Sequence, residues 1–201
     1  MKPAAPIPVL ETERLRLRPF TFDDEAAVFA LVSDPEIAHF VRFDAHRTPA
    51  ETRAFLELVE RYYRRGEPFA WGIVRREDER LIGSCGFVSQ AGEKKSAEIG
   101  YWLGKPYWGK GYAVEAARTL VHFGFEQMNL ERVEAKCFVE NRAGQRVIEK
   151  LGMKLEGTDR SEMIKGAYPE LNMYGISRED WRGEQTPDSP PRMHADERGS
   201  K

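Results

Sequence analysis

Six consecutive residues have the composition of an anion-binding loop: Trp108, Gly109, Lys110, Gly111, Tyr112 and Ala113. A strand-like run over residues 97–103 precedes them, and small or apolar residues at helical spacing follow them. The first N–H groups of a helix have no partner within it, and the helix dipole places positive potential there. The two glycines let the backbone come close to a phosphate and adopt dihedral angles that side chains disfavour. The stretch therefore predicts a phosphate site at a strand-to-helix corner.

Two common phosphate loops fit this stretch poorly. A P-loop has Ser or Thr after its Gly-Lys pair, whereas Gly111 follows Lys110 here. The dinucleotide fingerprint would need a third glycine at position 114, which is Val114. A glycine turn that only joins a strand to a helix explains the same residues. The loop alone therefore leaves the function open.

The elements that would position this loop follow from periodicity and capping residues. Thr48, Pro49 and Glu51 form the clearest helix start, because Thr48 and Glu51 can make a capping box and Pro49 suits the first turn. Four helices are expected, beginning near Thr21, Thr48, Ala113 and Asn141. Strands are expected over residues 14–18, 69–74, 81–88, 97–103, 132–138, 153–156 and 171–176.

Length and composition narrow the function classes. A chain of 201 residues suits one domain, which we expect over residues 10–182, between a flexible arm (1–9) and a disordered tail (183–201). A net charge of −2 gives no overall attraction to nucleic acid or anionic membrane. The arginines at 14, 16 and 18 are expected to form the solvated or salt-bridged side of an edge strand rather than a nucleic-acid stripe. Two cysteines, no signal peptide and no membrane-length apolar run favour a cytoplasmic protein with buried thiols.

The loop resembles the acetyl-CoA pyrophosphate loop of the GNAT N-acetyltransferase superfamily, whose pattern is Gln/Arg-x-x-Gly-x-Gly/Ala. Gly111 and Ala113 fill the last two defined positions, and Trp108 stands where the pattern has Gln or Arg. Residues 12–19 and 141–153 resemble the opening and closing signatures of the RimJ/RimL branch, so the likeness spans residues 10–182. It implies the GNAT fold: an α+β protein with a mixed, mostly antiparallel seven-stranded sheet flanked by about four helices.

The resemblance also implies acetyl transfer from acetyl-CoA to an amine, without a metal. Residues 108–113 would hold the pyrophosphate of the cofactor. The pantetheine arm would lie between two splayed parallel strands, residues 97–103 and 132–138, and pair with the backbone at Leu103. An amide within residues 101–103 would stabilise the oxyanion. Asn141 would bind the pantetheine or acetyl end, although an ordinary helix N-cap explains this asparagine as well.

Glu98 is the expected general base of this reaction. It opens the central strand among Ala97, Ile99 and Tyr101, where loss of water favours a carboxyl group that takes up a proton. The alternative is a carboxylate at a strand end that pairs with Lys94 or Lys95.

The expected general acid is missing from the sequence pattern. The RimJ/RimL branch commonly has Asn-x-x-Ser, with the serine placed to protonate the thiolate, but the fourth residue here is Gly144. Tyr112, Tyr168, Tyr174 or a water molecule could substitute, and their spacing selects none of them.

The acceptor is expected to be a protein N-terminal amine. A terminal amine has a pKa of about 7.7–8.0 against about 10.4 for lysine, so a general base removes its proton more easily. Residues 36–47 would lie beside the acceptor site. A small amine (a polyamine, amino acid or aminoglycoside) and a catalytically silent acyl-CoA-binding module are the alternatives. The sequence leaves the oligomeric state open, including a homodimer.

Overall fold

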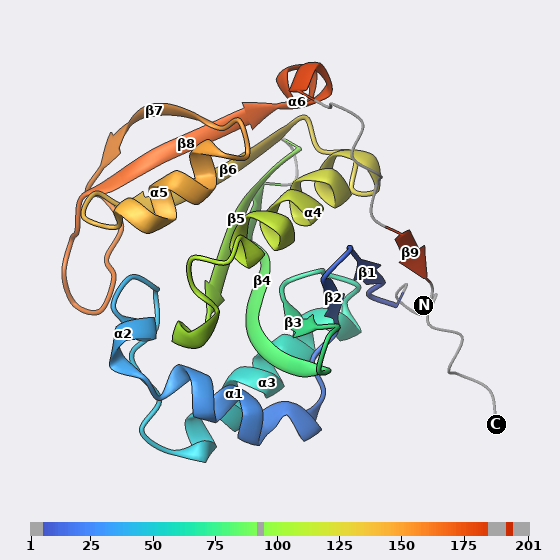
Figure 1. The fold of residues 1–201 in the computed structure, drawn as a ribbon. Coiled ribbons are helices and arrows are strands. Elements are labelled where there is room, and N and C mark those ends of the chain that lie inside the picture. Colours follow the sequence, from blue (N-terminus) through green and yellow to red (C-terminus); the bar gives the residue numbers. More distant parts are fainter. Residues whose placement is uncertain (1–5, 92–94, 185–191, 195–201) are drawn as a thin grey trace.

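The computed structural model describes residues 6–91, 95–184 and 192–194. Their strands form one nine-stranded sheet in the order β7-β8-β6-β5-β4-β3-β2-β1-β9 (Figure 1). The strands are β1 (Val9–Glu11), β2 (Leu15–Arg18), β3 (Trp71–Arg75), β4 (Arg80–Ala91), β5 (Ser96–Leu103), β6 (Arg132–Phe138), β7 (Lys154–Asp159), β8 (Leu171–Ser177) and β9 (Arg192–His194). The predicted α+β class with a mixed, mostly antiparallel sheet is confirmed.

The helices of the described residues include the four that periodicity predicts and two more. They are α1 (Glu25–Val32), α2 (Pro35–Ala38), α3 (Pro49–Arg64), α4 (Tyr112–Glu126), α5 (Arg142–Glu149) and α6 (Arg178–Glu184), with short 3-10 turns η1 (Phe22–Asp24) and η2 (Lys105–Tyr107). The capping box of Thr48 and Glu51 is present at the start of α3. Gly152, after α5, has the left-handed φ of 77° that is typical of a helix end.

The predicted strand count of seven is wrong, because the sheet also contains β1 and β9. β1 pairs with β2 on one side and with β9 on the other. Each is only three residues long, too short for alternation to show in the sequence. β1 begins inside the predicted N-terminal arm, and β9 lies inside the predicted disordered tail. Residues 1–5, 185–191 and 195–201, on which the rest of those two predictions falls, lie outside the described residues.

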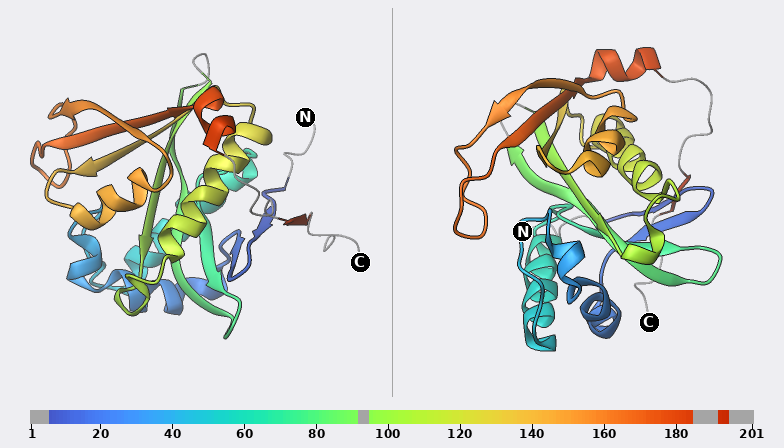
Figure 2. Two further views of the ribbon diagram at one scale, coloured as in Figure 1. Left: turned by 45° about the horizontal axis from the view of Figure 1, so that its top comes forward. Right: turned by 60° about the vertical axis from the view of Figure 1, so that its left-hand side comes forward.

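Helices cover the sheet on both faces, and each face has its own apolar core. α4 packs on one face through Ala116, Ala117 and Leu120, which are fully buried. α1 and α3 lie on the other face, around Val28 and Val59 (Figure 2). Successive residues of β5 therefore contribute to different cores, because neighbouring side chains of a strand point to opposite faces.

The sheet opens between β5 and β6, its only parallel pair of strands in the described residues. Pairing is limited to three positions, Ser96 with Arg132, Ala97 with Val133 and Glu98 with Glu134. Beyond them β5 continues to Leu103 and β6 to Phe138 without pairing to each other. Figure 2 shows β6, β7 and β8 turned away from β4 and β5 like a fan. The predicted splay of two parallel strands is present.

The described residues contain neither a membrane-spanning helix nor a cluster of metal-binding side chains. No helix among them combines the length and the apolar character needed to span a membrane. No group of three or more His, Cys, Asp or Glu side chains in the same ranges is arranged to hold a metal ion.

Candidate active site

The backbone of β5 presents polar groups to the gap between β5 and β6. The amide of Gly104 donates to the Ile82 carbonyl on β4 at 2.8 Å, so the backbone groups of Gly104 point toward β4. Backbone N–H and C=O groups of successive residues point to alternate sides of a strand. The amides of Tyr101 and Leu103 therefore point away from β4, into the gap. An extended chain placed in the gap could therefore pair with β5 as an extra strand would.

The glycine loop at the end of this gap has the backbone geometry that its sequence predicts. Gly109 and Gly111 have left-handed φ values of 72° and 82°, and α4 begins directly after them at Tyr112. A Cβ atom built on Gly109 would meet no atom within 4 Å, so the space beside it is open. The hydrogen bonds of the described chain leave the amides of Gly111, Tyr112 and Ala113 unused. These residues fit an anionic group such as a pyrophosphate.

Trp108 fixes this loop to the end of β5. Its indole Nε1–H donates to the Leu103 carbonyl oxygen at 2.8 Å, and the residue is 45 % exposed. Sequence reasoning placed Trp108 and Leu103 together at the cofactor site but did not foresee this bond. The Leu103 carbonyl accepts the indole N–H, and the Leu103 amide points into the gap toward an incoming chain.

Arg14 also holds the loop, which sequence reasoning missed. Its Nη1 donates to the Lys110 carbonyl at 3.0 Å, and its Nη2 lies 2.6 Å from Glu115 on α4. The guanidinium also lies over the Tyr112 ring, 4.7 Å from its centre. Arg14, Arg16 and Arg18 form salt bridges, one of the two roles expected for this row, but β2 is not the expected edge strand, because β1 and β3 pair with it on either side. Their alternation did not predict that Arg14 would set the shape of this loop.

Asn141 caps α5 and faces the same gap. Its Oδ1 accepts a hydrogen bond from the Gly144 amide at 2.9 Å, which is the ordinary N-cap arrangement. The Nδ2 group donates to no described residue, so it remains available to a ligand carbonyl. The structural and the ligand-binding interpretations of Asn141 are therefore compatible.

A cavity of about 760 Å³ connects these groups. It extends from the glycine loop and α5 to α2 and the residues after it, and both Tyr101 and Trp102 line it. Tyr101 belongs to the core under α4, whereas Trp102 packs with the core around α1 and α3. Because these two neighbours point to opposite faces of β5, the cavity passes through the sheet at the gap.

Arg42 joins two carboxylates on the Trp102 side of β5. Its Nη2 donates to Glu98 Oε1 and its Nε to Glu162 Oε1, both at 2.6 Å. Lys136 on β6 also donates to Glu162, at 3.1 Å. Burial lowers the pKa of the Arg42 guanidinium, but its bonds and charge interactions with the two carboxylates outweigh burial and raise this pKa. The bond to Arg42 in turn lowers the pKa of Glu162.

Glu98 stands at the closed end of the gap, at the last position where β5 and β6 pair. Its side chain is only 9 % exposed. The apolar surroundings expected from the sequence are therefore incomplete, because Arg42 approaches from 56 positions away. The alternative partners also differ from expectation: Lys95 lies 3.8 Å from Glu131, and Lys94 lies outside the described residues. Oε2 of Glu98 accepts no hydrogen bond from the described chain and is free to act.

Comparison with known proteins agrees with this geometry. A model of the acetyltransferase (GNAT) domain family matches residues 14–154. The chain belongs to the GNAT acetyltransferase family. It is 33 % identical over 170 residues to the uncharacterized N-acetyltransferase YoaA of Bacillus subtilis (strain 168), an alignment that covers 84 % of this chain and 96 % of YoaA.

Two further proteins are similar to this chain. A ribosomal-protein-serine acetyltransferase of Escherichia coli (strain K12) is 35 % identical over 103 residues, which are 51 % of this chain and 57 % of that protein. The crystal structure of a GNAT-family acetyltransferase from Bacillus anthracis superposes with a TM-score of 0.75 at 30 % identity, over 85 % of this chain and 99 % of that one. This GNAT chain is an acetyltransferase, and its family uses acetyl-CoA.

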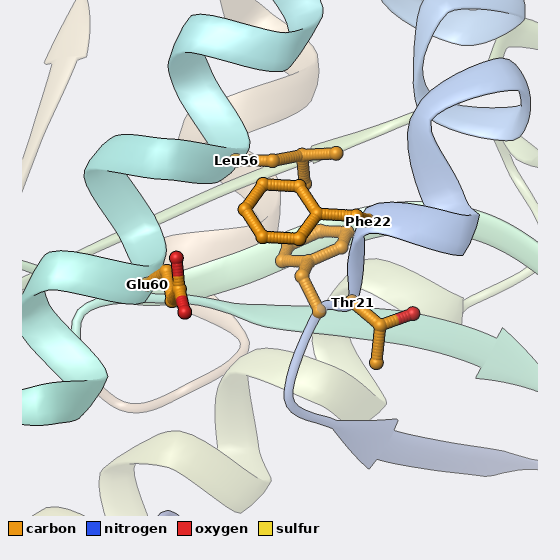
Figure 3. A pocket seen from close by; sticks show the side chains of 5 residues that line it. Thr21, Phe22, Leu56 and Glu60 are labelled. Carbon is orange, nitrogen blue, oxygen red and sulfur yellow. The ribbon is translucent and has the colours of Figure 1, made fainter.

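A smaller hollow lies away from the GNAT site, between η1 and α3 (Figure 3). It has a volume of about 250 Å³ and is lined by Phe20, Thr21, Phe22, Leu56 and Glu60. The Glu60 carboxylate already accepts a bond from Arg64 at 2.7 Å. Since this hollow is below the usual ligand-site range, which begins at about 300 Å³, the large cavity is the better site.

Gly144, at the position where the RimJ/RimL pattern has serine, is closely packed against two side chains. A Cβ atom there would stand 2.7 Å from Asn141 Nδ2 and 2.9 Å from Cys137 Sγ. We expect Gly144→Ser to lower the free energy of unfolding by about 1–3 kcal/mol, the usual cost of overpacking. Thermal or urea unfolding would measure the change, and Ala143→Ser on the exposed side of the same helix is the control. Equal stability of the two variants would show that position 144 has room for a side chain.

Proposed function

We propose that this GNAT acetyltransferase transfers the acetyl group of acetyl-CoA to the terminal amine of a protein, in a ternary complex. The cavity that passes through the sheet carries the proposal, because it gives a donor on one side and an acceptor on the other access to the same gap. Unused amides at Gly111, Tyr112 and Ala113 support pyrophosphate binding by residues 108–113. The amides of Leu103 and Tyr101 would pair with the pantetheine arm and polarise the thioester carbonyl.

Glu98 is the proposed base, acting directly or through a water molecule. The acceptor amine must lose a proton before its nitrogen can attack the thioester carbon. Glu98 lies where the gap closes, buried and with one oxygen free of hydrogen bonds from the described chain. Arg42 holds the other oxygen and fixes the direction of the carboxylate.

A protein N-terminus is favoured as the acceptor by the charge at the gap, by the pKa of terminal amines and by the name of one relative. Glu98 has one carboxylate oxygen without a partner in the described residues, which can accept a bond from a cationic amine, whereas Arg42 and Lys136 already pair with Glu162. A terminal amine is neutral at pH 7 in roughly one molecule in ten, whereas a lysine amine is neutral in well under one in a thousand. The Escherichia coli relative is described as acting on a ribosomal protein, and it covers half of this chain.

An acceptor panel tests this proposal. Release of free thiol from acetyl-CoA would be followed with peptides that carry a free terminus, the same peptides with a blocked terminus and an internal lysine, and spermidine, amino acids and aminoglycosides. We expect the highest kcat/KM with free-terminus peptides. Preference for a small amine would replace the acceptor but keep the reaction. Acetyl-CoA binding without turnover of any amine would identify a silent binding module and contradict the proposal.

Arg14 offers a separate test of the proposed pyrophosphate loop. We expect Arg14→Gln to weaken acetyl-CoA binding about three- to tenfold, because one charge-assisted bond that shapes the loop is lost at a partly exposed site. Isothermal titration calorimetry would measure the Kd. Arg16→Gln is the matched control, since Arg16 pairs with Glu11 and Glu79, away from the loop. Equal affinities for the two variants would separate Arg14 from cofactor binding.

A further inference from the structure

We infer that the Tyr101 phenol is the proton donor to the departing CoA thiolate. This inference rests on the proposed function, and it fills the role that Gly144 leaves vacant. Tyr101 is on β5, beyond the last position that pairs with β6, so it stands at the open part of the gap. Its side chain lines the large cavity together with Asn141 and Gly144.

The Tyr101 phenol contacts Gly144 on α5, the residue at the position where the RimJ/RimL pattern has serine. Its hydroxyl donates to the Gly144 carbonyl oxygen at 3.2 Å, in a partly buried setting. A serine side chain at 144 would meet Asn141 and Cys137, whose atoms fill that space. The Tyr101 hydroxyl, which comes from β5, therefore lies next to residue 144 although that residue has no side chain. Rotation about its C–O bond lets the same hydrogen point to either the carbonyl or a sulfur.

The tyrosines considered from the sequence are less suitable. Tyr112 lines the cavity, but its ring lies under Arg14 and its hydroxyl bonds to Arg75 beside the glycine loop. Tyr168 is 58 % exposed, on the loop between β7 and β8. Tyr174 is buried on β8 and interacts with Asn172, and it is not among the residues that line the cavity. Tyr101 combines burial, access to the gap and contact with α5.

Base and acid then approach the gap from opposite faces of one strand. Glu98 shares its face of β5 with Trp102, whereas Tyr101 shares the other face with Leu103. The amine nitrogen forms a bond to the acetyl carbon, and Glu98 takes the proton that the nitrogen loses. The C–S bond breaks, its electron pair stays on sulfur, and the phenol proton moves to that sulfur. Glu98 releases its proton to solvent and the phenolate regains one from water, so amide and thiol are the only products.

The surroundings of Tyr101 keep this proton in place until it is needed. Burial raises the pKa of the phenol, so it stays protonated throughout the working pH range. The same lack of water raises the proton affinity of a thiolate formed beside it. Burial therefore raises the proton affinity of both groups, and the proton moves only once the thiolate has formed.

The first test removes only the hydroxyl. We expect Tyr101→Phe to lower kcat on the order of 10²-fold, while the Kd for acetyl-CoA changes less than about threefold. Tyr174→Phe, which removes the hydroxyl of a buried residue that does not line the cavity, is the control and should keep kcat. A kcat for Tyr101→Phe close to that of the wild type overturns the inference. An equal loss of acetyl-CoA affinity also overturns it, because Tyr101 would then serve binding.

The second test distinguishes proton donation from packing. Tyr101→3,5-difluorotyrosine keeps the hydroxyl and lowers the phenol pKa, so an alkaline decline of kcat should move to lower pH than in the wild type. An unchanged pH profile overturns the inference. Wild-type protein that binds acetyl-CoA but acetylates no amine would instead overturn the proposed function, and this inference with it. Turnover by the wild type and by Tyr101→Phe at one rate would overturn the inference alone.

Discussion

Glu98→Gln is expected to lower kcat by about 10²- to 10³-fold while the affinity for acetyl-CoA stays within about twofold of wild type. The amide keeps the size of the carboxylate and can still accept a bond from Arg42, but it cannot take a proton from the amine. Arg42 also keeps its bond to Glu162, so the loop that carries it remains anchored. The loss should therefore be in the chemical step. Steady-state kinetics with a free-terminus peptide and calorimetry with acetyl-CoA would separate the two effects.

Glu134→Gln is the matched control for this prediction. Glu134 lies directly opposite Glu98 in the register of β5 and β6. Its side chain is 44 % exposed and pairs with Arg132 at the surface. Substitution there removes an exposed carboxylate from the same register position on the neighbouring strand and leaves the buried carboxylate of Glu98 in place. A similar drop in kcat for both variants would mean that the field of the two carboxylates matters, and that Glu98 is not the base.

The parts of this site that the sequence predicts are those set by local backbone rules. Gly109 and Gly111 adopt positive φ values because the chain must turn sharply from η2 into α4. Asn141 caps α5, and Thr48 and Glu51 cap α3, because each satisfies amides within three residues of itself. Such preferences depend on neighbours in the chain and are therefore visible without a fold.

The parts that the sequence does not predict depend on contacts between distant segments. Arg42 meets Glu98 only after the loop that follows α2 folds over β5, and Arg14 meets Lys110 across 96 positions. Nothing in the spacing of these residues indicates either pair. Tyr101 is an intermediate case: alternation along β5 places it on the face of Leu103, but its bond to Gly144 requires the position of α5. The resemblance to the GNAT family supplied the order of strands, not these side-chain partners.

Gly111→Asp is expected to weaken acetyl-CoA binding by at least about 10²-fold, which corresponds to roughly 3 kcal/mol. The new carboxylate would stand at the N-terminus of α4, where the proposed pyrophosphate needs the free amides, and the two negative charges would repel each other at short range. Backbone strain complicates a simple comparison with wild type, because Gly111 has a φ of 82°. Gly111→Asn is therefore the control: asparagine has the same shape without the charge and tolerates the left-handed conformation about as well as aspartate. Calorimetry on both folded variants isolates the charge effect, since the strain is shared. Comparable Kd values for the Asp and Asn variants would place the pyrophosphate elsewhere and remove the loop from the proposed mechanism.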